Sequence, residues 1–401
     1  MFVFQSECEV QIANIGINLF PNRGGIYRTV KSFTQVFNQL AWDASVLNFG
    51  ASIEGPTAFA CPSTFIQTLR WPKLRQYYVG LGYYKPEIRK VLSSADVVFI
   101  HGIFHHAAAV VSAYCRARNV PYILVSHGSL DPYVFTYNSI RKRVWTTTYR
   151  KRLFVDSAAV LFSTQAEAEK AKRWTNGGNV EVLYWPVDLV PEYDKSDAKA
   201  ELRRRYELPP KTRIALFCGR LDPMKRPIET IREFKAAAGK EWALLLVGPL
   251  SHGLSRETVD SACREPGAKC IWVGPAYGED LGDHFRAADL FILWSHRENF
   301  SHVVAEALAC AVPVFISRGV DLWRDLAPVG CSFLAPEGAE GSVSGALSRV
   351  LCMSEEDLGA AGRRGRVWAR DELSVERFGR RVERICESVS SGRKREPVSL
   401  P

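Results

Sequence analysis

Short apolar runs alternate with longer stretches of mixed polarity along the whole chain. The clearest runs lie at residues 10–20, 95–100, 120–125, 161–163, 182–184, 213–218, 242–247, 270–273, 290–294 and 312–316. Most have the length of a buried strand, and the stretches between them show the three-to-four-residue apolar spacing of helices. Strands that alternate with helices predict α/β domains with parallel, doubly wound sheets.

Two acidic residues lie on either side of the junction between the run at 290–294 and the helix predicted after it. Glu298 falls in the loop and Glu306 within the predicted helix, with seven residues between them. A helical segment of this length rises by about 12 Å, roughly the length of a sugar diphosphate. Its N-terminus offers unpaired N–H groups and a positive dipole end to an anion. The pattern predicts one extended anionic ligand held at both ends; the alternative is a capping Glu298 and a solvated or ion-paired Glu306.

A second charged segment follows the apolar run at 213–218. Gly219 opens a tight turn that carries two cations, Arg220 and Lys225. Ligands of open α/β sheets bind beyond the carboxyl ends of the strands. An arginine fork and a lysine point charge are suited to a diphosphate. The turn therefore predicts a diphosphate site; the alternative is a pair of cations that are only solvated.

Together these segments resemble motifs of the retaining nucleotide-sugar glycosyltransferases of family 4, which have the GT-B architecture. The resemblance rests on Gly219-Arg220-Leu221-Asp222-Pro223-Met224-Lys225 with Glu298 and Glu306. Further family-like features are Gly24-Gly25, His127, Trp185-Pro186-Val187-Asp188, Val247-Gly248-Pro249 and Val273-Gly274-Pro275. Two departures are Ser301 and Ala311, where many members of the family have glycine.

The resemblance implies a GT-B fold, in which two Rossmann-like domains with doubly wound parallel sheets face a cleft. A length of 401 residues also predicts two domains. We expect an acceptor-side domain at residues 1–188 and a nucleotide-sugar-binding domain at 189–373. A helix at 374–387 is expected to cross back to the first domain, and a polar, basic tail at 388–401 is expected to be disordered.

The family also implies a role for individual residues of these motifs. Arg220 and Lys225 would stabilise the charge that develops on the leaving diphosphate. Glu298 would contact sugar hydroxyls, Glu306 the ribose, and His127 the donor sugar near the reacting carbon. The expected catalytic residues are His127, Arg220, Lys225 and Glu298. The expected donor-binding residues are Gly24, Gly25, Gly219, Arg220, Lys225, Glu298, Asn299, Phe300, Ser301, His302 and Glu306.

The histidines and cysteines bear on metal binding. His101 and His127 both end predicted strands and are site candidates, although a histidine at a strand end is often structural. His105 and His106 are neighbours in the next predicted helix and cannot face one ligand together, which argues against a zinc pair. Ten scattered cysteines without a Cys-x-x-Cys pair predict reduced thiols. Since the chain has no Asp-x-Asp triplet, we expect no metal, and no cofactor besides a nucleotide sugar as co-substrate.

The net charge of +9 belongs mainly to the first half of the chain. Residues 1–190 contain 20 Lys and Arg against 12 Asp and Glu, and aromatic and basic residues gather at 70–90 and 141–152. Such tracts suit an anionic membrane surface, a pyrophosphate-linked lipid or nucleic acid, or else form a solvated helix face. Nucleic acid is not an expected partner, because no zinc-finger, RNP-type or helix-turn-helix signature accompanies the charge.

The hydropathy of the chain bears on its location. The first twenty residues have no basic leader, and no other segment reaches eighteen uninterrupted apolar residues. We therefore expect a cytoplasmic protein, peripheral at the inner membrane face if it meets a membrane. The expected function is retaining transfer of a hexose from a nucleotide-diphosphate sugar to a saccharide or lipid-linked saccharide in cell-surface polysaccharide assembly. The alternatives are a GT-B sugar-nucleotide epimerase and a catalytically silent GT-B module that binds a partner or glycan.

Overall fold

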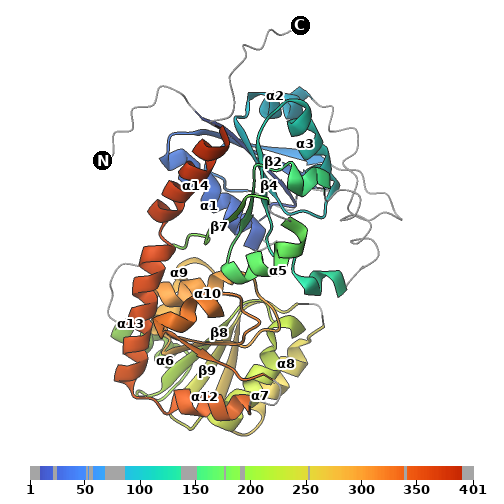
Figure 1. The fold of residues 1–401 in the computed structure, drawn as a ribbon. Helices are drawn as coiled ribbons and strands as arrows, with labels where there is room; N and C mark the ends of the chain where they lie inside the picture. The colour runs from blue at the N-terminus through green and yellow to red at the C-terminus, as the bar shows by residue number, and fades with distance from the viewer. Residues whose placement is uncertain are drawn as a thin grey trace. The chain divides into compact units, whose positions relative to one another are not determined.

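The computed structural model divides into two compact units. It describes residues 10–20, 25–50, 53, 57–67, 86–136, 151–175, 178–189, 195–251, 253–337 and 341–390. The first unit combines Met1–Trp185 with Val375–Pro401, and the second consists of Pro186–Ser374. Each unit contains one parallel sheet with helices on its faces (Figure 1). The predicted α/β class with two doubly wound, Rossmann-like sheets is confirmed.

The first unit contains a seven-stranded sheet in which all neighbouring strands run parallel. The strands lie in the order β3 (Ser63–Gln67), β2 (Asp43–Gly50), β1 (Gln11–Ile17), β4 (Val97–His101), β5 (Tyr122–Val125), β6 (Ala159–Phe162) and β7 (Val180–Val182). The chain order reverses between β1 and β4, and ligands of such sheets bind beyond the carboxyl ends of the strands at this switch point. Because β4 ends at His101, this histidine lies at the switch point.

The helices that cover this sheet come from both ends of the chain. They are α1 (Gly25–Gln39), α2 (Pro86–Ser94), α3 (His106–Ala117), the 3-10 helix η3 (Pro132–Thr136), the π-helix η4 (Lys151–Val155), α5 (Gln165–Thr175) and α14 (Val375–Ser390). Helix α14 lies against α1 (Figure 1), where the buried rings of Phe378 and Phe33 have their centroids 4.9 Å apart.

The end of α14 differs from the predicted one. The helix continues to Ser390, so the predicted start of the disordered tail at residue 388 is wrong. Serine in this stretch is compatible with a helix because its hydroxyl bonds to the preceding turn, as Ser388 Oγ does to the Ile385 carbonyl oxygen at 2.8 Å. Residues 391–401 lie outside the described part of the chain.

The second unit contains a six-stranded parallel sheet. The strands lie in the order β10 (Lys269–Gly274), β9 (Trp242–Val247), β8 (Arg213–Cys218), β11 (Leu290–Leu293), β12 (Val314–Ile316) and β13 (Ser332–Leu334). The switch point of this sheet lies between β8 and β11, the two strands that precede the charged segments predicted to bind a ligand.

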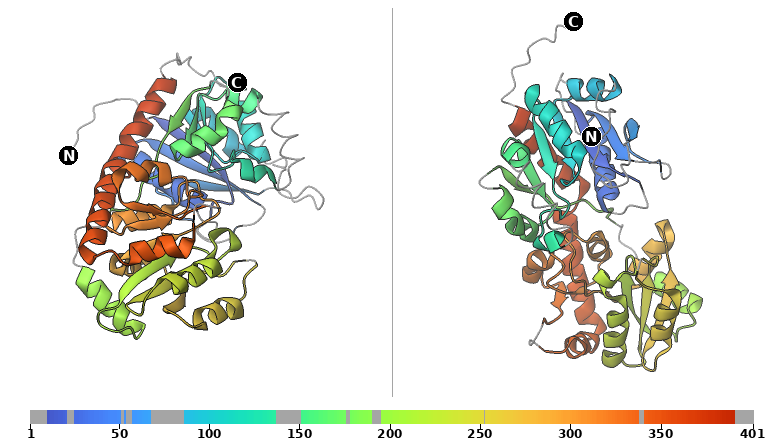
Figure 2. Two further views of the ribbon diagram at one scale, coloured as in Figure 1. Left: turned by 60° about the horizontal axis from the view of Figure 1, so that its bottom comes forward. Right: turned by 90° about the vertical axis from the view of Figure 1, so that its right-hand side faces the viewer.

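Helices also flank the second sheet, as two further views show (Figure 2). They are α6 (Lys195–Arg205), the 3-10 helix η5 (Pro223–Lys225), α7 (Pro227–Ala237), α8 (Arg256–Arg264), α9 (Gly278–Ala287), α10 (His302–Ala309), α11 (Trp323–Leu326), the 3-10 helix η6 (Ala327–Val329), α12 (Val343–Leu351) and α13 (Glu355–Glu372). None of the helices in the described part of the chain combines the length and apolar character of a membrane-crossing segment.

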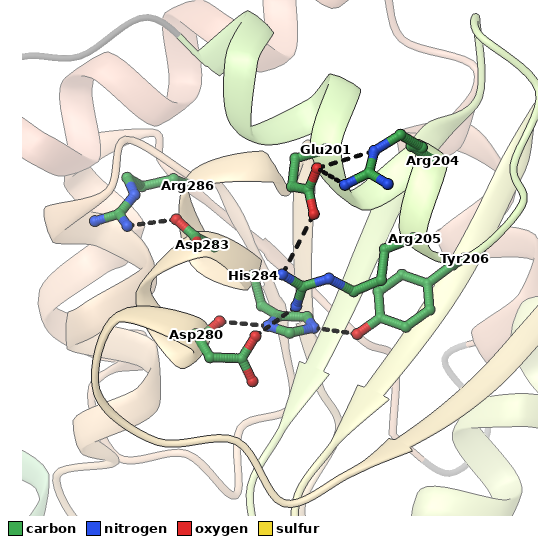
Figure 3. A network of polar contacts seen from close by, with 8 residues as sticks. All are labelled: Glu201, Arg204, Arg205, Tyr206, Asp280, Asp283, His284 and Arg286. Carbon is green, nitrogen blue, oxygen red and sulfur yellow. Dashed lines mark hydrogen bonds and ion pairs between the residues drawn. The ribbon is translucent and has the colours of Figure 1, made fainter.

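A polar network attaches α6 to α9 (Figure 3). His284 is fully buried, and its Nδ1 donates to the Asp280 carbonyl oxygen at 2.6 Å, so its Nε2 accepts from the Tyr206 hydroxyl at 2.8 Å. Burial lowers the pKa of His284, which favours this neutral form. Arg205 pairs with both Glu201 and Asp280. The network joins the first helix of the second unit to the helix that precedes β11.

The apolar pattern does not predict three of the strands, β2, β3 and β13. In β2 the polar Asn48 interrupts the apolar residues. Its buried side chain is fully hydrogen-bonded to Leu19, because its oxygen accepts from the Leu19 N–H at 2.9 Å and its nitrogen donates to the Leu19 carbonyl oxygen at 3.2 Å. β3 and β13 are short strands at the edges of the sheets. An edge strand is stabilised by hydrogen bonds to one neighbour and needs no long apolar run.

Candidate functional site

The turn after β8 packs tightly against the turn after β9. Gly219 and Gly248 have backbone φ angles of 140° and 147°, which side-chain-bearing residues rarely adopt. A Cβ atom on Gly248 would lie 1.9 Å from the Gly219 carbonyl oxygen, and one on Gly219 would lie 3.2 Å from the Lys225 side chain. Glycine at both positions therefore allows the loops at the carboxyl ends of two central strands to approach this closely.

Lys225 is positioned by a short hydrogen-bonded turn. The carboxylate of Asp222 accepts from the backbone N–H groups of Met224 and Lys225 at 3.0 and 3.3 Å. The next residue, Arg226, has a left-handed φ of 53° and is the N-cap of α7. The turn directs the lysine side chain back over Gly219, where it fills the space that a Cβ atom would need.

Lys225 forms an ion pair with Glu298, which follows β11. The two side chains are only 14% and 19% exposed, so water screens this pair less than a surface pair. The backbone of Glu298 is fixed, because its N–H donates to the Gly319 carbonyl oxygen at 2.7 Å and its own carbonyl oxygen accepts from Asp321 N–H at 2.9 Å. The structure thus joins the two charged segments that the sequence predicted separately.

Helix α10 begins at His302, so residues 298–301 are not helical. The predicted positions of Glu298 in the loop, where it forms an isolated β-bridge with Val320, and of Glu306 in the helix are confirmed. The predicted rise of eight helical residues between them is wrong, because the helix includes only the part from His302 onward. The reason is the backbone of Ser301, whose left-handed φ of 57° cannot continue a helix. Among the described residues no side chain caps the first turn of α10, which begins four residues after Glu298, and the N–H groups and positive dipole end of such a turn favour an anion.

Ser301 and Ala311, the two departures from family glycines, both have left-handed backbone angles, with φ of 57° and 51°. This conformation costs a non-glycine residue about 1 kcal/mol, so the structure gives a physical reason for glycine at these positions. The Ser301 side chain is buried, and its hydroxyl has no hydrogen-bond partner in the described part of the chain. Phe300, which precedes it, is a core residue with only 1% exposure, so its side chain is not part of an open site.

Arg220 differs from Lys225 in its surroundings. Its side chain is exposed, and no described residue forms an ion pair with it. Its backbone carbonyl oxygen accepts from Asp222 N–H at 3.0 Å, which keeps the turn tight. The loop therefore carries one paired cation and one that is open to an anionic ligand.

A cavity of about 340 Å³ lies beside this loop and was not indicated by the sequence motifs. It is lined by Arg226, Trp294, Ser295, His296, Ser317, Pro336 and Glu337. The Arg226 guanidinium lies 4.5 Å from the centre of the Trp294 ring, and its Nε donates to His296 Nε2 at 2.8 Å. Burial, followed by the charge of Arg226, lowers the pKa of His296 and keeps it a neutral acceptor. The polar lining and the tryptophan make the cavity suitable for a hydroxyl-rich ligand.

In the first unit, His127 lies in the turn after β5 with a left-handed φ of 50°. This turn is held by Glu167, which is buried and accepts from Gly128 N–H at 2.6 Å and from the N–H and hydroxyl of Ser163 at 2.8 and 2.6 Å. Sequence reasoning did not assign Glu167 to the site. The available signal was the capping pattern Thr164-x-x-Glu167, in which Glu167 N–H donates to Thr164 Oγ1 at 3.1 Å.

The two strand-end histidines are in direct contact. His101 Nδ1 lies 3.0 Å from His127 Nε2, and His101 Nε2 lies 3.2 Å from the side-chain oxygen of Asn14 on β1. Burial lowers the pKa of His101 well below its usual value, and the neighbouring His127 and His105 lower it further. His105 is the N-cap of α3 and not a residue within that helix, because its Nδ1 accepts from Ala108 N–H at 3.0 Å. Burial lowers the pKa of His105 to about 4.

Some predicted features cannot be placed. Gly24, residues 70–85 and residues 141–150 lie outside the described part of the chain. Gly25 is the first residue of α1, where its carbonyl oxygen accepts from Thr29 Oγ1 at 3.1 Å. Among the described residues, no group of three or more His, Cys, Asp or Glu side chains is arranged to hold a metal ion.

Two family models match the chain. The model described as "Glycosyl transferases group 1" matches residues 198–355, which include Arg220, Lys225, Glu298 and Glu306. The model described as "Glycosyltransferase Family 4" matches residues 23–190, which include His127. The two matches do not overlap and together span most of both units.

Curated relatives match parts of the chain. TuaC of Bacillus subtilis (strain 168), whose name assigns it to teichuronic acid biosynthesis, is 29% identical over 208 residues, which cover 52% of this chain and 49% of TuaC. A D-inositol 3-phosphate glycosyltransferase of Salinispora arenicola is 35% identical over 149 residues, which cover 34% of this chain and 33% of that protein. The matches thus span about half or less of the length of these relatives.

Solved structures match nearly the whole chain. The structure of HepE from Anabaena in complex with UDP and glucose has a TM-score of 0.70 at 18% sequence identity and covers 94% of this chain and 100% of the HepE chain. At this level of identity the likeness shows a shared fold. The expected GT-B architecture, with two parallel-sheet Rossmann-like domains, is confirmed.

Proposed function

We propose that this chain, which belongs to the group 1 glycosyltransferases of family 4, transfers a sugar from a nucleotide-diphosphate sugar with retention of anomeric configuration. The observation that carries the proposal is the Lys225–Glu298 pair between the cationic turn after β8 and the uncapped start of α10. These elements follow β8 and β11, the strands at the switch point of their sheet. A nucleotide sugar as donor is supported by HepE, whose structure contains UDP and glucose.

The reaction would use the charges at this switch point. Departure of the nucleoside diphosphate leaves negative charge on the leaving group, and preorganised cations and backbone N–H groups stabilise that charge as it develops. Arg220 is exposed and open to a phosphate. Lys225 and Glu298 form an ion pair with each other before the donor binds. On donor binding, Lys225 would contact a phosphate oxygen and the Glu298 carboxylate would accept a hydrogen bond from a sugar hydroxyl. Glu306, within α10, is the candidate partner for the ribose.

A donor panel tests the proposal. Purified protein is mixed with UDP-, GDP- and ADP-sugars, and the cognate donor is expected to raise the unfolding temperature because it binds only the folded state.

Transfer or slow donor hydrolysis should continue in excess EDTA, since two cations and the α10 dipole neutralise the diphosphate. Activity that is lost on chelation and restored by Mg²⁺ or Mn²⁺ would contradict the metal-independent mechanism. Absence of both stabilisation and turnover with every donor would contradict the function itself.

The proposed acceptor is a saccharide or lipid-linked saccharide, with the enzyme peripheral at the inner face of the membrane. The teichuronic acid assignment of TuaC and the positive charge of residues 1–190 support this choice. Each basic residue near an anionic lipid surface contributes about 1 kcal/mol, and salt screens the attraction. Co-sedimentation with anionic vesicles is therefore expected to fall as salt rises.

Substitution separates membrane contact from donor binding. Glutamine is placed at Arg141, Lys142, Arg143, Arg150, Lys151 and Arg152. This variant should lose vesicle binding and keep the donor-induced thermal shift, because the residues proposed to hold the diphosphate and the ribose, Arg220, Lys225 and Glu306, lie in the second unit. A control variant with glutamine at the exposed Lys211 and Lys240 of the second unit should bind vesicles as the wild type does. If the wild-type protein does not co-sediment with anionic vesicles at low salt, the membrane proposal is wrong and a soluble acceptor is favoured.

A further inference from the structure

The cavity beside Arg226 lies beyond the carboxyl ends of three neighbouring strands. Its other lining residues come shortly after β11, β12 and β13, and Arg226 itself is the N-cap of α7. Ligands of parallel α/β sheets bind beyond this end of the strands. The volume of about 340 Å³ falls within the range of about 300–1,000 Å³ that is typical of small-molecule sites. None of its lining residues belongs to the set proposed to hold the donor.

Arg226 is a half-buried cation without a carboxylate partner. No described residue forms an ion pair with it. Its guanidinium lies 4.5 Å from the centre of the Trp294 ring and bonds to the neutral His296. Burial lowers the pKa of Arg226, and the charges of Glu229 and Glu337 oppose this effect only in part. A cation that is partly removed from water and not ion-paired favours an anionic ligand.

The contact between Arg226 and His296 contains a mismatch of donors. A neutral imidazole ring has one lone pair and one N–H group. Because His296 Nε2 accepts from Arg226 Nε at 2.8 Å, the proton of the ring is on Nδ1. Arg226 Nη2, which can only donate, lies 2.6 Å from that Nδ1. Two donors therefore face each other, and an oxygen atom that accepts from both would remove the conflict.

Ser295 adds a hydroxyl group to the lining of the cavity. The residue is only 1% exposed, and its Oγ has no hydrogen-bond partner in the described part of the chain. A buried hydroxyl without a partner costs free energy. The loop is fixed, because the Ser295 carbonyl oxygen accepts from Ser317 Oγ at 2.5 Å and His296 N–H donates to the Met224 carbonyl oxygen at 2.8 Å. The cavity thus combines donors of three side chains on a preformed backbone.

We propose that this cavity is a second ligand site, which binds the phosphate group of a small sugar phosphate through Arg226, His296 and Ser295. A tetrahedral phosphate suits the site because its oxygens accept hydrogen bonds from several directions. The Trp294 ring and the Glu337 carboxylate suit the sugar, since the ring packs against apolar atoms and the carboxylate accepts from hydroxyl groups. The negative charge of Glu337 disfavours free phosphate beside it. The proposal does not depend on the proposed glycosyl transfer.

Isothermal titration of the full chain with glucose 6-phosphate, inorganic phosphate and glucose tests the proposal. Glucose 6-phosphate is expected to bind more tightly than either of its two parts. Arg226→Gln should weaken its binding about 10- to 100-fold, as expected for the loss of a hydrogen bond to a charged group. Ser295→Ala should also weaken binding but should not lower the unfolding temperature, because the hydroxyl that it removes has no partner in the described part of the chain. A Ser295 that serves only the packing of the loop would leave the affinity unchanged.

Two control variants locate the binding. Arg256→Gln removes another arginine that lies over a tryptophan, 4.8 Å from the centre of the Trp272 ring, but does not line the cavity, so the affinity should stay at the wild-type value. Arg220→Ala alters the diphosphate turn and should also keep the affinity for glucose 6-phosphate.

Three results would overturn the proposal. The first is the absence of binding at millimolar glucose 6-phosphate. The second is binding that is lost in Arg220→Ala and kept in Arg226→Gln, because the ligand would then occupy the diphosphate turn. The third is inorganic phosphate that binds as tightly as glucose 6-phosphate, because the cavity would then not recognise the sugar. If Arg226→Gln does not fold, Ser295→Ala decides the question.

Discussion

Replacement of Arg220 or Lys225 by alanine is expected to lower kcat about 10²- to 10³-fold, as for removal of one preorganised charge-stabilising group. The two residues should differ in a second respect. Arg220 has no ion-pair partner among the described residues, so Arg220→Ala should fold as stably as the wild type. Lys225→Ala leaves the partly buried Glu298 without its partner and should also lower stability. Steady-state kinetics and thermal unfolding of both variants measure these effects.

Two variants make this test specific. Lys211→Ala removes an exposed lysine that precedes β8 at the opposite end of the strand, and it should leave kcat unchanged. Lys225→Ala combined with Glu298→Gln removes both charges of the pair and should recover the stability, but not the kcat, that Lys225→Ala loses. Turnover near the wild-type value in Arg220→Ala or Lys225→Ala would refute their assignment to the diphosphate.

Gly248→Ala is expected to be the most damaging single substitution in the second unit, with a loss of about 3 kcal/mol or more from overpacking and backbone strain combined. The added Cβ atom would lie 1.9 Å from the Gly219 carbonyl oxygen, and neither backbone can move without disturbing the turn that carries Arg220 and Lys225. Denaturant unfolding should show the loss of stability. Donor-induced stabilisation should disappear at the same time, because the diphosphate turn would be displaced.

Gly274→Ala is the matched control for this prediction. Gly274 is the last residue of β10 and has a positive φ of 90°, but a Cβ atom there would meet nothing within 4 Å. Its substitution adds backbone strain alone, worth about 1 kcal/mol. If both variants unfold at the same denaturant concentration, the close approach of the Gly219 and Gly248 loops has no energetic importance.

The sequence predicted the central strands of both sheets better than their edges. The runs at 213–218 and 242–247 coincide with β8 and β9, in which nearly every residue is buried. A strand covered on both faces must be apolar throughout, so its pattern is visible in the sequence. β2, β3 and β13 were not predicted, because their residues are partly polar and their pairing depends on a neighbouring strand far away in the sequence.

The sequence also indicated most residues of the candidate site in the second unit, but it overestimated the helical rise between the two acids. Turn-forming residues around Gly219 indicated Lys225, and an acid at a strand end indicated Glu298. It gave no sign that these residues are partners, since 73 positions separate them. The helical rise assumed between Glu298 and Glu306 was wrong because Ser301 adopts a left-handed angle, which a sequence pattern of apolar spacing does not reveal.

The sequence by itself determined the α/β class, the two-unit organisation of the fold and the identity of the charged turn residues, because apolar spacing and turn chemistry act between residues that are close along the chain. Only the tertiary structure decided that Lys225 pairs with Glu298, that Gly248 must lack a Cβ atom, and that His101 contacts both Asn14 and His127. These contacts join the ends of different strands. They arise because parallel strands bring their carboxyl ends to the same edge of a sheet, and the choice of neighbouring strands is a property of the whole fold.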